Sequence, residues 1–205
     1  NVLCVSEVDK RRMCELHHLQ PSKVKVVPNG VCISRYRKDS AAQVKLRHSL
    51  DKDSKIILFH GALGWKPNAE AAQEIVDSIA PEMDTYDSRA VFLIVGPQAS
   101  RKLLKRAEHR HNVRILGAVD DITDYVCSAD VCIAPMKTGS GTKLKILEYL
   151  AARKPVVATR KAVEGIAIQN GKHALLADTT GNEFIDLIKT AMTVETSELL
   201  ASNAG

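Results

Sequence analysis

Residues 131–150 read VCIAPMKTGSGTKLKILEYL. The segment begins with a short apolar run, Val131 to Ala134, passes through a turn with two glycines and continues with apolar residues at helical spacing. A short, continuous apolar run is typical of a strand that is buried on both faces of a parallel sheet. The stretch therefore predicts one strand–turn–helix step of an α/β fold.

The same step recurs on both sides of this stretch. The other predicted strands are Lys55 to His60, Ala90 to Val95, Val113 to Leu116, Pro155 to Thr159 and Ala174 to Ala177. The predicted helices are Pro67 to Ala80, Arg101 to His109, Ile122 to Cys127, Thr142 to Arg153 and Asn182 to Thr193. Because crossovers between parallel strands are right-handed, we predict an α/β, doubly wound Rossmann-like parallel sheet with helices on both faces. Any ligand is expected outside the carboxyl ends of the strands.

A shorter unit precedes this pattern. Val2 to Val5 and Val24 to Val27 are predicted strands with a helix between them, and the polar stretch that follows carries one weak helix. Such a polar stretch is typical of a junction between domains. We therefore expect residues 1–35 to be the end of a preceding domain or a junction segment, and residues 36–205 to be a Rossmann-like domain.

The composition excludes several classes of protein. Of the 205 residues, 45% are hydrophobic and 26% charged, as in globular proteins and unlike disordered or coiled-coil chains. The apolar runs are much shorter than the ~20 residues of a membrane-spanning helix. Five cysteines without a Cys-x-x-Cys pair predict a reducing compartment, the cytoplasm. Because the chain begins with Asn1, we expect it to be a piece of a longer protein.

The glycine-rich turn is the strongest local signal. Gly139 and Gly141 lack a Cβ, Ser140 and Thr142 can cap the following helix, and Lys143 adds a charge. The first amides of a helix are unpaired donors at the positive end of its dipole, and they suit a phosphate or diphosphate. An ordinary βα turn with a Thr142 N-cap and a solvated lysine explains the spacing equally well.

The helix after this turn carries Glu148. With Leu144, Leu147, Leu150 and Ala151 as the expected core face, Glu148 lies at the edge of that face. Its carboxylate would accept hydrogen bonds from ribose hydroxyls. The alternative is a surface pair with the lysine three residues earlier.

Two further turns lie at the expected ligand edge. After the first sheet strand, Gly61 allows a close backbone approach and Lys66 suits an anion, whereas His60 and Trp65 are expected to pack. After the third strand, the segment from Gly117 to Ile122 could offer backbone groups to a base. Its aspartates could equally cap the next helix.

The formal net charge of +5 suits an anionic small ligand as well as nucleic acid or a membrane surface. The densest basic run, Arg101 to Arg106, has no aromatic residues within it, so we interpret it as a solvated helix face rather than a nucleic-acid site. Cys14, His17 and His18 have zinc-like spacing but lack a second ligand pair, so no metal site is predicted.

Seven segments occur in an order that resembles a known family. They are Ser6-Glu7 with the helix to Leu16, Val26 to Val31, Gly61 to Asn68, Leu93 to Pro97, Val113 to Asp121, Ser128 to Val131, and Gly139 to Glu148 followed by Lys154 to Thr159. In this order they resemble the donor half of glycosyltransferase family 4, which has the GT-B fold, in a subgroup with a Gly-Ser-Gly-Thr loop. Each segment alone is weak evidence, but together they cover most of the chain.

The resemblance implies a retaining glycosyltransferase that transfers a sugar, hexosyl in type, from a nucleotide sugar to an acceptor held by the other half. The implied catalytic residues are Lys66, Lys143 and Glu148. The implied donor-binding residues are Gly61, Gly117, Val119, Ser140, Gly141 and Thr142. Glu148 would hold the ribose, the amides around Gly141 and Thr142 would hold the diphosphate with Lys143 and Lys66, and Gly117 and Val119 would face the base. Neither a cofactor nor a metal is expected.

The resemblance also implies partners and leaves alternatives. The donor would be a UDP-linked or GDP-linked sugar, the acceptor is unidentified, and peripheral membrane binding, at the inner face, would come only from the missing half. Two departures weaken the match. The first glutamate of the pair that is usual in the family is Ser140 here, and the basic residue that usually follows the glycine at position 61 is Ala62. The alternatives are a sugar-nucleotide epimerase of the same fold and a non-catalytic nucleotide-sugar-binding module. The isolated chain is expected to bind its donor but not to catalyse transfer.

Overall fold

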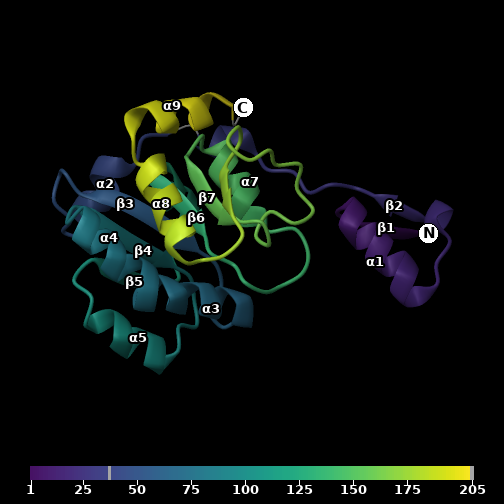
Figure 1. Ribbon diagram of the computed structural model, residues 1–205, viewed down its shortest axis with the longest axis horizontal. Helices are drawn as coiled ribbons and strands as arrows, with labels where there is room; N and C mark the ends of the chain where they lie inside the picture. The colour runs from purple at the N-terminus through teal and green to yellow at the C-terminus, as the bar shows by residue number, and fades with distance from the viewer. Residues whose placement is uncertain (37, 204–205) are drawn as a thin grey trace.

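The computed structural model describes residues 1–36 and 38–203, and Figure 1 shows a small N-terminal unit beside a larger α/β unit. The small unit contains β1 (Val2–Cys4), α1 (Glu7–His17) and β2 (Val24–Val26), with a 3₁₀ turn (Pro21–Lys23) before β2. The strands β1 and β2 pair in parallel. The predicted strand–helix–strand unit is therefore confirmed.

The larger unit is built on a six-stranded parallel sheet. Its strands are β3 (Lys55–His60), β4 (Ala90–Val95), β5 (Val113–Gly117), β6 (Val131–Ala134), β7 (Val156–Thr159) and β8 (Leu175–Ala177). Their order across the sheet is β5-β4-β3-β6-β7-β8. The chain moves outward from β3 to β5 and then outward on the other side from β6 to β8, so the order reverses between β3 and β6. This confirms the doubly wound prediction and places the ligand crevice beyond the carboxyl ends of β3 and β6.

Helices cover this sheet. They are α2 (Ala41–Arg47), α3 (Lys66–Glu74), α4 (Ala80–Tyr86), α5 (Arg101–Glu108), α6 (Ile122–Ser128), α7 (Leu144–Ala151), α8 (Asn182–Ala191) and α9 (Val194–Asn203). Helix α8 packs over β6 to β8 and contacts α4, which lies against β4, whereas α6 and α7 both contact the 3₁₀ segment Ile33–Tyr36. These two groups are what a doubly wound sheet with helices on both faces requires.

One predicted helix is longer than expected. The prediction ended it at Ala80, before Pro81, but α3 continues through a π segment (Ile75–Ile79) into α4. The Ala80 N–H bonds to the Ile75 carbonyl, five residues back. The wider π turn makes room for the proline ring, which would crowd a regular helix. The helix α9, after the last predicted one, was not predicted either.

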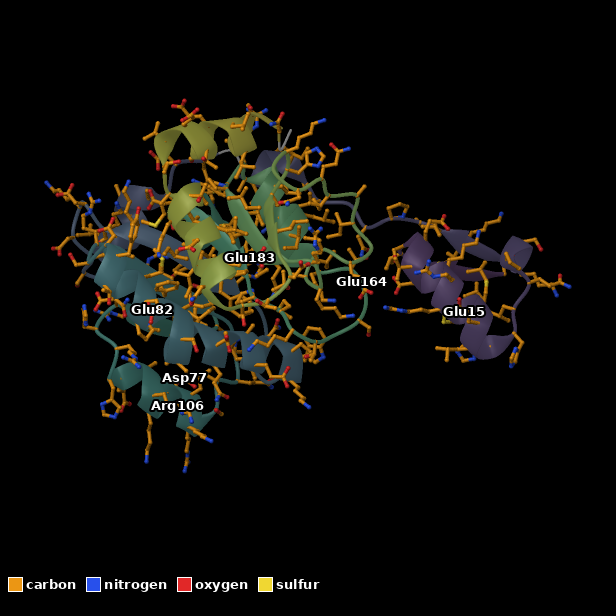
Figure 2. All side chains as sticks on the ribbon, viewed as in Figure 1. Glu15, Asp77, Glu82, Arg106, Glu164 and Glu183 are labelled. Atoms are coloured by element: carbon orange, nitrogen blue, oxygen red, sulfur yellow. The ribbon has the colours of Figure 1, made fainter. Side chains whose placement is uncertain are left out.

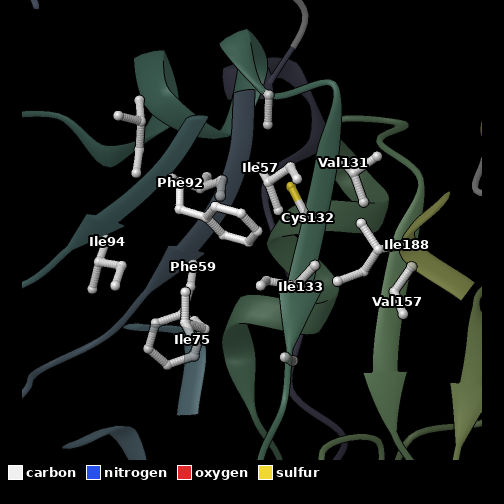
Figure 3. Close-up of a cluster of buried hydrophobic side chains, with 14 of the residues drawn as sticks. Ile57, Phe59, Ile75, Phe92, Ile94, Val131, Cys132, Ile133, Val157 and Ile188 are labelled. Atoms are coloured by element: carbon white, nitrogen blue, oxygen red, sulfur yellow. The ribbon is translucent and has the colours of Figure 1, made fainter. Parts of the chain in front are cut away.

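The core lies between the sheet and its helices. Figure 3 shows side chains of the central strands, among them Ile57, Phe59 and Phe92, packed against one another and against Ile75 of the long helix. The four residues from Ile56 to Phe59 are at most 1% exposed, which explains why this strand is apolar throughout. Tyr36 also belongs to this core, so the connection from the small unit is anchored there.

Asp121 caps the N-terminus of α6, as the capping alternative predicted. Its carboxylate accepts from the Thr123 N–H at 2.9 Å and pairs with Lys38 at 3.3 Å. The hydrogen bonds from Thr123 lower the pKa of Asp121 to about 2. Because this folded-state pKa is depressed, the stabilisation is present above the unfolded pKa of about 4 and is lost as the pH falls toward the folded value.

We expect Asp121→Ala to lower the free energy of unfolding by about 1 kcal/mol at neutral pH, the usual value of an N-cap. The difference from the wild type should shrink as the pH falls through that window. Urea unfolding at several pH values measures both effects. Asp120→Ala is the matched control, because that neighbouring side chain is exposed. An equal loss in both variants would contradict the capping role.

Candidate functional site

The structure brings together the turn after β3 and the glycine-rich loop after β6. Gly139 adopts a φ of +102°, and a Cβ at this position would lie 3.1 Å from the Trp65 ring and 3.2 Å from Pro67 Cγ. Trp65 therefore packs over the loop, as expected. The two segments that sequence reasoning singled out separately form one surface at the point where the strand order reverses.

Carboxylates of α3 hold the loop in place. Lys137 Nζ pairs with Glu74 at 2.7 Å, and the Thr138 hydroxyl donates to Glu70 at 2.6 Å. Lys66 also pairs with Glu70, at 3.7 Å, but its side chain is 84% exposed. In the described part of the chain, no ion pair or hydrogen bond joins Lys66 to Glu148. The proposed contact of Lys66 with a diphosphate stays a prediction.

The prediction for α7 was wrong in its start and in half of its core face, since Leu150 and Ala151 pack in or against the core but Leu144 and Leu147 do not. The helix begins at Leu144 rather than Thr142, and no side chain caps it. Leu144 is 52% exposed, whereas Lys145, Ile146 and Tyr149 are buried. Because apolar residues occur on both sides of this helix, spacing alone does not decide which side faces the core. Leu147, expected in the core, lines a cleft toward the small unit instead.

Lys143 is only 5% exposed, and its ammonium donates to the carbonyls of Ser140 at 3.2 Å and Gly141 at 2.7 Å. Burial lowers its pKa, and the nearby charge of Lys161 adds to the effect. The lysine was expected to be solvated or to face a ligand. In this structure it braces the glycine-rich loop from within.

Glu148 lies beside His60 at the carboxyl end of β3. The Glu148 Oε2 and His60 Nε2 atoms are 3.0 Å apart, although they do not align as a hydrogen bond. The Tyr149 hydroxyl accepts from the backbone N–H of His60 at 3.2 Å, and the two rings meet edge to face. The alternative pair of Glu148 with Lys145 is not formed.

The charges of this pair follow from burial. Burial lowers the pKa of His60, so the imidazole is neutral near pH 7. The His60 side chain lowers the pKa of Glu148 against the opposing effect of burial, so the carboxylate is ionised. Burial, together with the charge of Glu148, raises the pKa of Tyr36 to about 12. The site therefore presents one half-buried carboxylate that can accept hydrogen bonds.

Sequence reasoning missed Lys145 and Asn68 as members of the site. Lys145 is 8% exposed, and its Nζ donates to Asn68 Oδ1 at 2.7 Å and lies 4.2 Å from the centre of the Phe59 ring. Asn68 in turn donates to the Ala62 carbonyl at 3.0 Å. The sequence feature that could have revealed Lys145 is its place next to Ile146, on the side of α7 that is buried.

A glycine stands at the carboxyl end of three neighbouring strands: Gly61 follows β3, Gly96 follows β4 and Gly117 ends β5. The Gly61 N–H donates to Val95 at 2.9 Å, and the Gly96 N–H donates to Gly117 at 2.8 Å. No atom lies within 4 Å of where a Gly117 Cβ would be, so the backbone there is open. Val119 packs partly against the core. The role of Gly117 and Val119 toward a base stays a prediction.

A cleft of about 560 Å³ separates the two units. Ser6 and Asn29 line it from the small unit, and Thr142 and Leu147 line it from the large one. Glu164 lies on the side of the large unit that faces the small one (Figure 2) and pairs with Arg12 at 2.5 Å. The proposed boundary near residue 35 stays a prediction.

The remaining sequence motifs do not form a site here. Arg106 pairs with Asp77, and the two side chains point toward each other in Figure 2. All five cysteines are free. Within residues 1–36 and 38–203, no three or more His, Cys, Asp or Glu residues gather as metal ligands would. In the same residues, no helix has the length and apolar character needed to cross a membrane.

Solved structures share this fold. The structure of Anabaena HepE in complex with UDP and glucose superposes with a TM-score of 0.83 at 16% identity, over 99% of this chain and 56% of that one. The C-terminal domain of LpcC, a group 1 glycosyl transferase family protein from Francisella tularensis, matches with a TM-score of 0.68 at 14% identity, over 85% of this chain and 94% of that one. The predicted fold class and the resemblance to GT-B glycosyltransferases are confirmed.

Curated relatives and a family model agree with the fold. A D-inositol 3-phosphate glycosyltransferase of Acidothermus cellulolyticus is 28% identical over 83% of this chain and 40% of its own length. A phosphatidyl-myo-inositol mannosyltransferase of Mycobacterium leprae is 29% identical over 74% of this chain and 42% of its own length. The chain thus spans about two fifths of the length of these relatives. The model for "Glycosyl transferases group 1" matches residues 54–193. The chain therefore belongs to the glycosyl transferases group 1 family.

Proposed function

We propose that this chain is the donor-binding part of a retaining glycosyltransferase and that it binds a nucleoside diphosphate sugar. The observation that carries the proposal is the ionised, half-buried Glu148 on the helix that follows a glycine-rich loop, beside His60 at the switch point of a doubly wound sheet. Structures with this fold contain UDP or UDP-glucose, so a UDP-sugar is the first candidate.

Each part of the site suits one part of such a donor. The Glu148 carboxylate accepts from the ribose hydroxyls, and the open backbone of Gly117 faces the base. The amides around Gly141 and Thr142 and the N-terminus of α7 hold the diphosphate. The developing charge of the leaving nucleoside diphosphate is then stabilised by lysines and helix-end amides, without a metal. The acceptor is held by the rest of a longer protein.

The test is calorimetric titration of the 205-residue chain with UDP, GDP, ADP and their sugar conjugates. The proposal predicts selective binding of one nucleotide and its sugar conjugate. No binding of any nucleotide sugar, to this chain or to a longer protein that contains it, would refute the proposal. Product analysis of that longer protein without an acceptor distinguishes transfer from epimerisation. Donor binding without either reaction would identify a non-catalytic binding module.

Thr142 offers a sharper prediction on the loop. Its Oγ1 is buried and has no hydrogen-bond partner within the described chain, at the edge of the cleft. A hydroxyl left in this state costs free energy, so Thr142→Val should keep the stability or raise it by up to about 1 kcal/mol. If the hydroxyl binds a donor phosphate, the same variant should bind a UDP-sugar about 3-fold to 10-fold more weakly.

Thermal unfolding and calorimetry measure these two effects separately. Thr123→Val on α6 is the matched control for stability, since that hydroxyl is buried but hydrogen-bonded to Asp121. This control should lose stability where Thr142→Val does not. If the Thr142→Val variant binds the UDP-sugar with unchanged affinity, the Thr142 hydroxyl does not contact the donor.

A further inference from the structure

Lys145 is a buried cation without a carboxylate partner. Its Nζ donates to the neutral amide oxygen of Asn68 at 2.7 Å and lies over the Phe59 ring at 4.2 Å. Among the residues that the structure describes, no carboxylate lies within ion-pair distance of it. Burying an ammonium with only such partners is costly, and the cost falls when an anion binds beside it.

The position of this ammonium is set by a glycine. A Cβ on Gly61 would lie 2.9 Å from Lys145 Nζ and 2.6 Å from Asn68 Nδ2. The missing side chain therefore leaves the ammonium directly against the backbone of the turn after β3. Lys145 is also the second residue of α7, so its charge adds to the positive end of the helix dipole.

The other lysines near the turn and the loop are already engaged. Lys66 is exposed to solvent and pairs with Glu70. Lys143 uses its ammonium on the carbonyls of the glycine-rich loop. Residue 62, next to Gly61, is alanine and carries no charge. The positive charge at the carboxyl ends of β3 and β6 therefore comes chiefly from Lys145 and from the N-terminus of α7.

We propose that Lys145 supplies the charge that binds the diphosphate of the donor, and that it takes up a proton from solvent when the donor binds. This inference rests on the proposed function, since it concerns the same site. The chain uses a buried lysine from α7 at a place where the lysine of the turn after β3, Lys66, is exposed and paired with Glu70.

The charges around Lys145 set the direction of the effect. Burial lowers its pKa to about 7, the charge of Lys143 adds to the lowering, and the charge of Glu148 opposes it. The facing groups of the neighbouring elements, Asn68 and His60, are neutral near pH 7. A bound diphosphate favours the ammonium and raises its pKa. Above about pH 7, donor binding is therefore coupled to proton uptake.

The experiment is calorimetric titration of the 205-residue chain with UDP-glucose, whose diphosphate diester does not titrate near neutral pH. Titrations in two buffers of different ionisation enthalpy give the number of protons taken up. We expect uptake approaching one proton at about pH 8 and little uptake at about pH 6. The dissociation constant should rise by up to about 10-fold per pH unit above neutrality.

Lys145→Met keeps the apolar stem and removes the charge. We expect it to bind UDP-glucose about 10-fold to 100-fold more weakly at pH 6, without proton uptake and with little dependence on pH. Its melting temperature should equal or exceed that of the wild type, because an apolar residue replaces an uncompensated buried charge. Lys102→Met, on the exposed side of α5, is the matched control and should change nothing.

The outcomes separate the two proposals. If neither the wild-type chain nor a longer protein that contains it binds any nucleotide sugar, the proposed function fails, and this inference fails with it. If the wild type binds UDP-glucose without proton uptake, the inference alone is overturned, whether or not the variant folds. It is also overturned if Lys145→Met keeps the affinity of the wild type. Uptake that persists in Lys145→Met but disappears in His60→Gln would assign the proton to His60 and refute the inference.

Discussion

Glu148→Ala is expected to bind a UDP-sugar about 100-fold or more weakly than the wild type while keeping its fold. The carboxylate is ionised and only half-buried, so it can accept hydrogen bonds from two ribose hydroxyls. Hydrogen bonds to a charged group contribute about 1.5–3 kcal/mol each, and each 1.4 kcal/mol or so changes the affinity about 10-fold. The fold should survive because His60 is neutral and is not left as a buried charge.

Calorimetric titration with UDP-glucose measures this loss. Glu108→Ala is the matched control, because Glu108 is an exposed glutamate on α5, a helix that does not line the site. The control should bind as the wild type does, and both variants should unfold at nearly the wild-type temperature. If Glu148→Ala binds within about 3-fold of the wild type, the carboxylate does not hold the ribose.

Gly96→Ala is expected to lower the free energy of unfolding by about 3–5 kcal/mol. Gly96 follows β4 and adopts a φ of +156°, which a residue with a side chain rarely takes. A Cβ there would overlap the carbonyl oxygen of Gly61, which is backbone and cannot rotate away. The cost therefore combines backbone strain with the displacement of the turn after β3.

Urea unfolding measures this loss of stability. Gly30→Ala is the matched control, because no atom lies within 4 Å of where its Cβ would be. We expect the control to change stability by less than about 0.5 kcal/mol. Because the turn after β3 also carries Gly61 and Ala62, any folded Gly96→Ala protein should bind UDP-glucose more weakly. A loss below about 1 kcal/mol would mean that the strand ends have room to separate.

The strands were predictable because the sheet buries both of its faces. A strand covered on both sides must be apolar throughout, so β3, β4 and β6 stand out as continuous apolar runs with the predicted bounds. The alternation of strands and helices together with right-handed crossovers then leads to a doubly wound sheet. Local chemistry also identified Asp121 as a cap, since a cap depends on residues that are close in sequence.

The helices were less predictable. On α7, apolar residues occur on both sides. Of the residues that were expected in the core, Leu144 lies at the surface and Leu147 along the cleft, whereas Leu150 and Ala151 pack in or against the core. A residue on the buried side of α7 is Lys145, whose partner Asn68 belongs to α3, 77 positions earlier in the chain. The spacing of apolar residues along the sequence does not predict such a partner, because the energy of burying the lysine depends on an amide and a ring from other elements.

The sequence by itself therefore determined the strands of the sheet, its doubly wound class and the two glycine-rich segments that follow β3 and β6. Tertiary structure decided the environment of each lysine near these segments. In the folded chain, Lys143 donates to the carbonyls of its own loop, Lys66 is exposed to solvent and Lys145 is buried beside Gly61. The physical reason is that a buried strand can be recognised from consecutive apolar residues. The environment of a charge, in contrast, is set by groups that only the folded chain brings within a few ångströms.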